Sequence, residues 1–205
     1  MRSKKELEIQ LSKIPKFENP KAELEQHLTP ADLASTILWA AYLSGEIEGK
    51  VVADLGCGTG IFCKGAEVLG AEECLCIEID LEALNIAKSN LNSGIVNADV
   101  LSCPLRSVDT VLMNPPFGTV QRGIDKKFLM VAFSIAKEVI YSIHLFSEKT
   151  EKLFRRLALN YGFQTETIIT NYKMPIEYPW HRKRFYEMPV QVYKFKKIKQ
   201  EMTGT

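Results

Sequence analysis

The chain has 205 residues, of which 46% are hydrophobic, and its formal net charge at pH 7 is +1. This length suits one α/β domain (1–205) with a substantial core and leaves no room for a second full domain. A near-neutral balance does not by itself predict a nucleic-acid partner. Because no apolar run of about 18 residues is present and the N-terminus MRSKKELEIQ is charged, we expect neither a membrane span nor a signal peptide. The expected location is cytoplasmic.

The chain contains five cysteines, an odd number, and no two of them form a CxxC pair. This usage argues against a disulfide framework and against a zinc site, so we expect no bound metal. Small buried hydrophobic side chains are the simplest interpretation, and reduced thiols fit the cytoplasm. The cysteines are Cys57, Cys63, Cys74, Cys76 and Cys103.

The first 30 residues predict a helix followed by a flap. Leu7, Leu11 and Ile14 are spaced as on one face of an amphipathic helix beginning at residue 4. A stretch containing two prolines then interrupts the helix. We expect this N-terminal extension (1–30) to act as a lid.

A second helix is predicted in the segment LEQHLTPADLASTILWAAYLSG. Thr29 has the residue type of an N-cap, and Pro30 suits the first helical position. Gln26 and Thr29 then lie at the mouth of the helix, where polar side chains can face a ligand. Simple capping is the competing interpretation, and the spacing alone favours it.

The segment KVVADL (50–55) is a continuous apolar run with β-branched residues, typical of a strand buried in a parallel sheet. It leads into GCGTG and then into the predicted helix IFCKGAEVLG. Glycines let such a loop turn tightly and bring backbone amides against a ligand. Asp54, two residues before Gly56, would repel a phosphate, so we expect it to orient the loop or to meet a cationic ligand.

The next two predicted strands end in acidic residues. Glu78 lies near the carboxyl end of ECLCIEID, where a carboxylate can accept both hydroxyls of a ribose. Asp80 is better interpreted as the N-cap of the following helix. The third strand, GIVNADV, ends in Asp99 and Val100, which can bind the exocyclic amine of adenine and pack on its face, although Asp is also common in turns.

The most informative stretch is SVDTVLMNPPFG (107–118), in which a run of β-formers ends in Asn-Pro-Pro-Phe. Two prolines offer no N–H and fix their own φ, so the strand must stop at Asn114 in a rigid, extended turn. The Asn114 side-chain oxygen and the Pro115 carbonyl can then act as neighbouring acceptors beside an aromatic ring. This arrangement suits a planar group that carries an NH₂, whereas an ordinary strand-ending turn is the simpler alternative.

The alternation of helices and strands continues to the end of the chain. A helix (125–137), a strand (138–145) and another helix (147–161) precede two β-rich segments (163–173 and 185–195), which should pair antiparallel because no helix separates them. Six alternating β/α units closed by an antiparallel pair predict a doubly wound α/β sheet, with its ligand at the carboxyl ends of the early strands.

A basic segment, YPWHRKRFYEMPVQVYKFKKIK (178–199), interleaves cationic and aromatic side chains. Such a pattern suits contacts with phosphates and stacking on bases, and a solvated face on a terminal strand pair is the alternative. The candidate RNA-binding residues are Arg182, Lys183, Arg184, Lys194, Lys196 and Lys197.

The motifs DLGCGTG, IEID, NAD and NPPF, in this order over nearly the whole chain, resemble those of class I S-adenosylmethionine-dependent methyltransferases that act on amino groups. Together with LEQHLT and NPPFGT they are most similar to the methyltransferase-like 5 family, which N6-methylates an adenosine in small-subunit ribosomal RNA. One departure is His27, where that family more often has Tyr. The resemblance implies a Rossmann-like, mostly parallel, seven-stranded sheet with an antiparallel C-terminal strand.

The resemblance also implies which residues form the site. S-adenosylmethionine carries a sulfonium and an amino acid moiety but no phosphate, which agrees with an acid beside the glycine loop. The expected catalytic residues are Asn114, Pro115, Pro116 and Phe117, with Phe117 stacking on the base. The expected residues around S-adenosylmethionine, and later its product S-adenosylhomocysteine, are Gln26, Thr29, Asp54, Gly56, Gly58, Thr59, Ile61, Glu78, Asp99 and Val100.

Other functions and partners stay open at this point. A DNA amino methyltransferase usually needs more domain mass, and a protein glutamine methyltransferase more often has Tyr at position 117. An inactive methyltransferase-fold scaffold is disfavoured by the intact motifs. The expected substrate is structured RNA, and the resemblance implies a small zinc-binding activator protein that covers an edge strand, for which residues 94–100 are the candidate.

Overall fold

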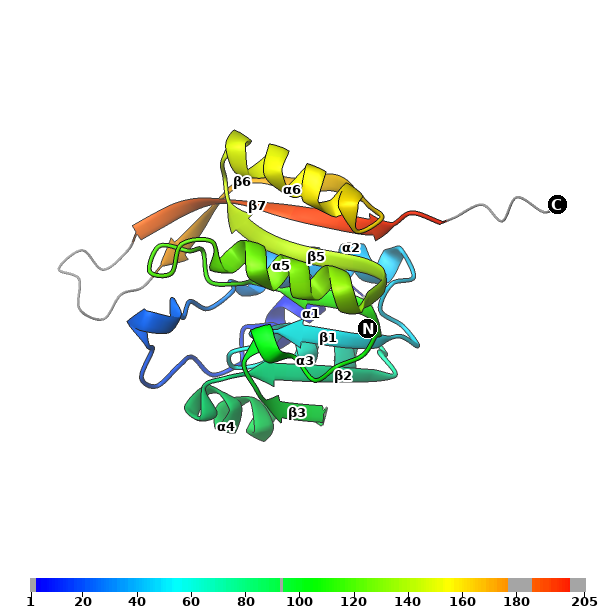
Figure 1. Ribbon diagram of the computed structural model, residues 1–205. Coiled ribbons are helices and arrows are strands. Elements are labelled where there is room, and N and C mark those ends of the chain that lie inside the picture. The colour runs from blue at the N-terminus through cyan, green and yellow to red at the C-terminus, as the bar shows by residue number, and fades with distance from the viewer. Residues whose placement is uncertain (1–2, 93, 177–185, 200–205) are drawn as a thin grey trace.

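The computed structural model describes residues 3–92, 94–176 and 186–199. Its centre is one seven-stranded sheet (Figure 1). The strands are β1 (Val51–Leu55), β2 (Glu73–Glu78), β3 (Gly94–Asn97), β4 (Val108–Met113), β5 (Ala136–Leu145), β6 (Phe163–Ile176) and β7 (Tyr186–Lys197). Their order in the sheet is β3-β2-β1-β4-β5-β7-β6. β1 to β5 pair in parallel and β7 is antiparallel to both β5 and β6, which confirms the predicted sheet.

Helices cover both faces of this sheet, and each face has its own apolar core (Figure 1). The helices are α1 (Lys4–Leu11), α2 (Ala31–Leu43), α3 (Ile61–Val68), α4 (Leu81–Asn90), α5 (Ile124–Ile135) and α6 (Glu148–Asn160), with the short 3-10 helices η1 (Ala22–Leu24) and η2 (Val100–Ser102). Buried residues of α1 to α4 contribute to one core, and those of α5 and α6 to the other. The helices therefore change from one face of the sheet to the other once, between α4 and α5.

The carboxyl ends of β1, β2 and β4 lie side by side at the same end of the parallel strands. Asp54, near the end of β1, lies beside Cys76 of β2 and Leu112 of β4. The strand order reverses between β1 and β4, and such a switch point opens a crevice at the carboxyl ends of parallel strands. The three segments with the strongest motifs thus meet at this end of the strands.

Two details of the predicted elements are wrong. The β3–β4 connection contains only η2 and no α-helix, so the number of alternating β/α units is smaller than the predicted six. Helix α2 begins at Ala31, and its N-cap is Pro30, which makes no side-chain capping hydrogen bond. Thr29 is therefore not the cap, and its hydroxyl has another partner.

The N-terminal helix packs against the body of the protein. Leu7 and Leu11 are buried in the same core as α2 and α3, and Lys4 Nζ donates a hydrogen bond to Thr36 Oγ1 of α2 at 3.1 Å. Burial of two leucines stabilises this docking by roughly 1.5 to 3 kcal/mol each. The predicted lid thus begins after α1, in the segment that leads to α2.

Two disulfides overturn the prediction that the cysteines are reduced. Cys57 is bonded to Cys76, and Cys63 to Cys74, with Cα–Cα separations of 5.5 and 5.4 Å. The glycine loop and α3 lie against β2, which brings together cysteines that are 19 and 11 residues apart. Sequence spacing carries no sign of this proximity. Cys103 is the one cysteine without a disulfide.

In the described part of the chain, no cluster of three or more His, Cys, Asp or Glu residues has an arrangement that could hold a metal ion. Within the same residues, no helix combines the length and the apolar character that crossing a membrane requires.

The disulfides predict the alkylation pattern of the protein. Iodoacetamide under denaturing, non-reducing conditions should label Cys103 alone, whereas prior reduction should expose all five thiols. Intact-mass spectrometry distinguishes one added group from five. Reduction should also lower the free energy of unfolding by about 3 kcal/mol for each loop that is released. Labelling of five cysteines without reductant would contradict the assignment.

Candidate active site

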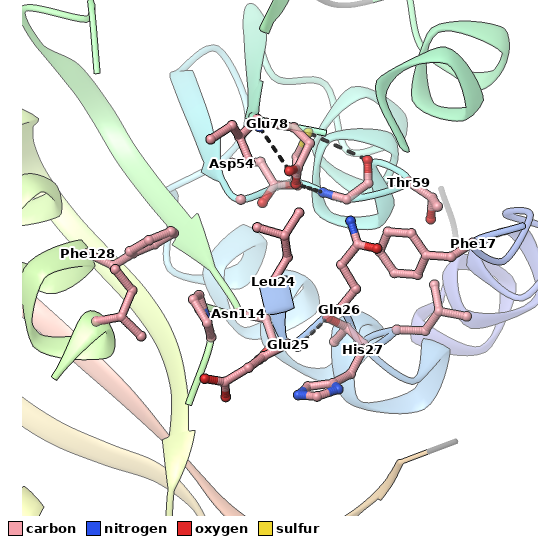
Figure 2. A pocket seen from close by; sticks show the side chains of 18 of the residues that line it. Phe17, Leu24, Glu25, Gln26, His27, Asp54, Thr59, Glu78, Asn114 and Phe128 are labelled. Atoms are coloured by element: carbon pink, nitrogen blue, oxygen red, sulfur yellow. Dashed lines mark hydrogen bonds between the residues drawn. The ribbon is translucent and has the colours of Figure 1, made fainter. Parts of the chain in front are cut away.

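A cavity of about 260 Å³ opens at the carboxyl ends of β1, β2 and β4 (Figure 2). The strap, defined here as residues 21–29 between α1 and α2, forms one of its walls. Val100, Pro115 and Phe117 do not line the cavity. The predicted residues that line it are Gln26, Thr29, Asp54, Gly56, Gly58, Thr59, Ile61, Glu78, Asp99, Asn114 and Pro116.

The glycine loop connects β1 to α3 under this cavity. Gly58 has φ of 54°, in the left-handed region that favours glycine. A Cβ at Gly58 would lie 2.8 Å from Cζ of Phe17, so the loop also needs glycine to let the Phe17 ring approach. The loop backbone thus stays open toward the cavity.

Glu78 holds the glycine loop in place. Its Oε2 accepts a hydrogen bond from the Gly58 amide, and its Oε1 accepts from the amides of Ile79 and Asp80, each at 2.9 Å. Burial raises the pKa of Glu78 above its ordinary value, although these three N–H groups act in the opposite direction. The carboxylate therefore joins β1 to β2 and presents a fixed acceptor at the cavity wall.

Asp54 is a buried acid that is poorly matched by hydrogen-bond donors. Its side chain is 1% exposed, and no side-chain donor meets either carboxylate oxygen. Burial raises the pKa of Asp54 to about 8 against a backbone hydrogen bond from Cys63, and the charge of Glu78 adds to the rise. A buried carboxylate with so little compensation costs free energy unless a cation meets it, so this position is suited to a positively charged ligand group.

A polar network ties the strap to the carboxyl end of β2. Gln26 Nε2 donates to Asp80 Oδ2 at 2.7 Å, Lys21 Nζ pairs with Asp80 Oδ1, and the Lys21 amide donates to Gln26 Oε1. Although burial opposes it, the hydrogen bonds from Lys21 and Gln26 hold the pKa of Asp80 below its ordinary value. As predicted, the same carboxylate caps α4 by accepting from the Glu82 amide.

The side-chain amide of Asn114 has a hydrogen-bonded nitrogen and an oxygen without a hydrogen-bond partner. Its Nδ2 donates to Thr29 Oγ1 at 3.1 Å, whereas its buried Oδ1 has no hydrogen-bond partner. Because Thr29 holds the nitrogen, the oxygen is left as an acceptor beside the cavity (Figure 2). Thr29 thus has a more specific contact than the helix capping predicted for it.

Phe117 lies behind the cavity wall. Its side chain is 7% exposed, and its ring centroid is 5.4 Å from that of His27, with an angle of 31° between the planes. Burial lowers the pKa of His27, against a smaller opposing effect of Glu25, so the ring is neutral at pH 7. The face of Phe117 is therefore covered by His27 in this structure.

Sequence reasoning missed several apolar residues of the cavity. Ile79 and Leu101 line it close to Asp99, at the place where Val100 was expected, while Val100 is 3% exposed and belongs to the core. Asp99 accepts a hydrogen bond from the Leu101 amide, which caps η2. The pattern of exposed apolar residues gave no signal, because it depends on how the strand ends pack. The other apolar residues that were missed are Phe17, Leu24, Leu28, Phe62, Ile124 and Phe128.

The basic residues of β7 lie in the second half of that strand. Lys194 forms an ion pair with the buried Glu46 at 2.9 Å, and Lys197 donates to the Tyr161 carbonyl. Lys196 pairs with Val139 in the first half of β5 and Lys194 with Tyr141 near its middle, whereas the cavity lies at the carboxyl ends of the parallel strands. Arg182, Lys183 and Arg184 lie outside the described residues.

Fold and site together define a class I S-adenosylmethionine-dependent methyltransferase. Residues 29–141 match the family model of the Methyltransferase small domain. The fold is shared with magnesium protoporphyrin IX methyltransferase from Synechocystis, solved with bound S-adenosylmethionine, at 15% identity and a TM-score of 0.57 over 80% of this chain and 77% of that one. The residues fit this cofactor, since Asp54 offers a buried carboxylate that no side-chain donor meets and Glu78 a fixed acceptor.

Closer relatives identify the family. The chain is 37% identical to the rRNA N(6)-adenosine-methyltransferase METTL5 of Danio rerio over 93% of this chain and 97% of that protein. It is 40% identical to PH1948 of Pyrococcus horikoshii, solved as a candidate RNA methyltransferase, with a TM-score of 0.87 and full coverage of both chains. The chain belongs to the METTL5 family of rRNA N6-adenosine methyltransferases.

The buried acid Asp54 predicts a dependence of stability on pH. Because the pKa of Asp54 is higher in the folded than in the unfolded chain, its stabilising effect is present below about pH 4 and is lost as the pH rises to about 8. Asp54→Asn should therefore raise the Tm of the cofactor-free protein strongly at about pH 8.5 and little at about pH 4.5. Differential scanning fluorimetry measures both values.

Asp109 provides the matched control for this experiment. Although burial opposes it, hydrogen bonds from the Val51 amide and from Lys137 lower the pKa of Asp109. Asp109→Asn should therefore lower the Tm at neutral pH, the opposite sign. Equal shifts of the Asp54→Asn protein at both pH values would refute the raised pKa of Asp54.

Proposed function

We propose that this enzyme transfers a methyl group from S-adenosylmethionine to the N6 nitrogen of an adenosine in ribosomal RNA, with small-subunit RNA as the target. The observation that carries the proposal is the Asn114 amide, whose nitrogen is held by Thr29 and whose buried oxygen has no partner. An acceptor fixed in this way suits a planar amine. Membership of the METTL5 family supports RNA over DNA or a protein amide as substrate and argues against an inactive scaffold.

The residues at the ends of β1 and β2 would hold the cofactor. Bound S-adenosylmethionine supplies an electrophilic methyl carbon on a sulfonium and leaves as S-adenosylhomocysteine. Glu78 is placed to accept the ribose hydroxyls, Asp54 to face the methionine ammonium, and Asp99 to accept from the adenine amine. Ile79 and Leu101 supply the apolar surface for the adenine ring. The glycine loop, which has no side chains at its glycines, would let the cofactor approach its backbone.

The NPPF segment would orient the acceptor. The N6 lone pair is conjugated with the ring, so the nitrogen attacks well only when it becomes pyramidal. Asn114 Oδ1 and the Pro115 carbonyl would accept the two N–H groups and stabilise the positive charge that develops on N6. Asn114 and Pro115 act by orientation and electrostatics, and the proton leaves to water after transfer. The ring of His27 lies against Phe117, so the base can stack on Phe117 only if the His27 side chain moves.

The connection between β6 and β7 is the proposed RNA contact. Ile176 pairs with Tyr186, and Leu145, at the carboxyl end of β5, pairs with Val190, so the described ends of β6 and β7 lie on the side of the sheet that holds the cavity. Among the basic residues between these two ends, Arg182, Lys183 and Arg184 are the candidates that the sequence offers for phosphate contacts. Lys194 and Lys197 have structural partners, and Lys196 pairs with Val139 in the first half of β5, away from the carboxyl ends of the strands.

The same proposal includes a partner and a location. β3 is an edge strand that pairs with β2 alone, which supports docking of a small zinc-binding activator protein by strand addition. Co-expression with and without such a protein tests this, and full solubility and activity of the chain alone would remove the need for it. We treat 1–205 as one catalytic domain in the cytoplasm, where disulfides are known chiefly from hyperthermophiles.

The acceptor role of Asn114 predicts a loss of rate without a loss of cofactor. Asn114→Ala should lower the single-turnover rate of RNA methylation by about 10² or more, the scale for one lost transition-state hydrogen bond. Calorimetric affinity for S-adenosylmethionine should barely change. Phe117→Tyr should keep substantial activity, whereas Phe117→Ala should weaken use of RNA. A folded, cofactor-bound Asn114→Ala protein that works at the wild-type rate would overturn the proposed chemistry.

The proposed RNA contact predicts unequal effects of charge reversal. Arg182→Glu should weaken RNA binding and reduce the slope of log affinity against log salt by about 1, since one phosphate contact is lost. The side chain of Lys196 is exposed, and this residue pairs with Val139 in the first half of β5, away from the carboxyl ends of the strands. Lys196→Glu is therefore the matched control and should change neither quantity. Filter binding at several salt concentrations measures both proteins. Equal losses in the two variants would contradict this orientation of the RNA.

A further inference from the structure

Glu25 is a buried carboxylate that the proposed chemistry leaves unused. Among the described residues it is one of two non-glycine residues with positive φ, at 50°. Such a conformation is uncommon for a residue with a side chain and persists where surrounding contacts hold it. The side chain is 6% exposed, in a strap whose neighbouring residue Glu23 is exposed. The backbone at this position therefore directs a charged group inward.

The partners of Glu25 belong to the loop that follows the NPPF segment. Its Oε2 accepts from the Thr119 hydroxyl, and its Oε1 accepts from the Val120 amide, both at 2.9 Å. Burial alone would raise the pKa of Glu25, but these hydrogen bonds keep it below its ordinary value, so the group is ionised. Hydrogen bonds to a carboxylate are roughly twice as strong as those between neutral groups.

The strap therefore holds the catalytic segment at both ends. Thr29 accepts from Asn114 at the start of the segment, and Glu25 binds Thr119 and Val120 just beyond its end. Thr119 and Val120 are otherwise exposed, so Glu25 supplies the inner contact of this loop. Figure 2 shows Glu25 and Gln26 projecting from the strap in different directions. Gln26 binds Asp80 at the end of β2, on the cofactor side.

We propose that Glu25 is a positioning residue for methyl transfer, which fixes the turn after Phe117 so that Asn114 and Phe117 keep the geometry needed by the acceptor base. This inference rests on the proposed function of the NPPF segment. It extends that function by coupling the two halves of the site, because one strap contacts the cofactor side through Gln26 and the acceptor side through Glu25. Small displacements of positioned groups can cost about 10² in rate, so loss of this contact should be visible in the chemical step.

Removing the carboxylate tests the proposal. Glu25→Ala should lower the single-turnover rate on RNA by about 10- to 100-fold, while the Kd for S-adenosylmethionine stays within about twofold. Glu25→Gln should recover most of the rate, since its amide oxygen can accept from the Val120 amide and its nitrogen can donate to Thr119 Oγ1. The control is Glu72→Ala. Glu72 is exposed and lies just before β2, at the end of the strand opposite to the cavity, so this variant should behave as wild type.

A second variant approaches the contact from the loop. Thr119→Val removes the hydroxyl donor, keeps the buried carboxylate bonded to backbone amides of the loop such as that of Val120, and should lower the rate less than Glu25→Ala. This variant decides the matter if Glu25→Ala fails to fold. An unchanged rate in Glu25→Ala or Thr119→Val would overturn the positioning role. So would equal losses of rate and cofactor affinity, or a Glu25→Gln protein no better than Glu25→Ala.

The controls separate this inference from the function on which it rests. If the wild-type protein methylates RNA and Glu25→Ala does so equally well, the positioning role is wrong and the function stands. If neither the wild-type protein nor Glu72→Ala methylates RNA, the proposed function itself is refuted.

Discussion

The site depends on one buried carboxylate, that of Glu78. Placing an acid at 7% exposure is costly, and three backbone N–H groups from Gly58, Ile79 and Asp80 offset that cost. These groups belong to the glycine loop and to the turn that starts α4, so one side chain fixes both against the end of β2. Because its hydrogen bonds are already made, Glu78 meets a ligand with little further loss of side-chain freedom.

The strap adds a second constraint, because it contacts the proposed cofactor side and the proposed acceptor side of the site through different residues. On the cofactor side it is held by the ion pair and hydrogen bond to Asp80, and on the acceptor side by Thr29 and Glu25. Within this frame no side-chain donor meets the Asp54 carboxylate, and Asn114 Oδ1 has no hydrogen-bond partner. The fold thus satisfies Glu78 and leaves two acceptors poorly matched where a cationic cofactor and an amine would lie.

Local patterns predicted the elements, whereas contacts between distant segments were beyond them. Apolar runs and glycines placed β1 and its loop, and the order of motifs indicated where Glu78 and Asn114 would converge. The Cys57–Cys76 bond could not be foreseen, because it depends on how the loop lies on β2. Thr29 looked like a helix cap since its partner, Asn114, is 85 residues away. Composition likewise suggested Lys194 for RNA, whereas its partner in the fold is Glu46, 148 residues earlier in the chain.

Strand direction also constrains how RNA approaches. β7 runs antiparallel to β5, so the basic residues at its end lie near the start of β5, away from the cavity. There Lys194 offsets the charge of the buried Glu46, which also accepts a hydrogen bond from Tyr141. That pairing holds β7 against the sheet. In the proposed function, a base that reaches Asn114 must be unstacked from its neighbours. Lys194 and Lys197 already have partners within the fold, so their charges serve the packing of the sheet.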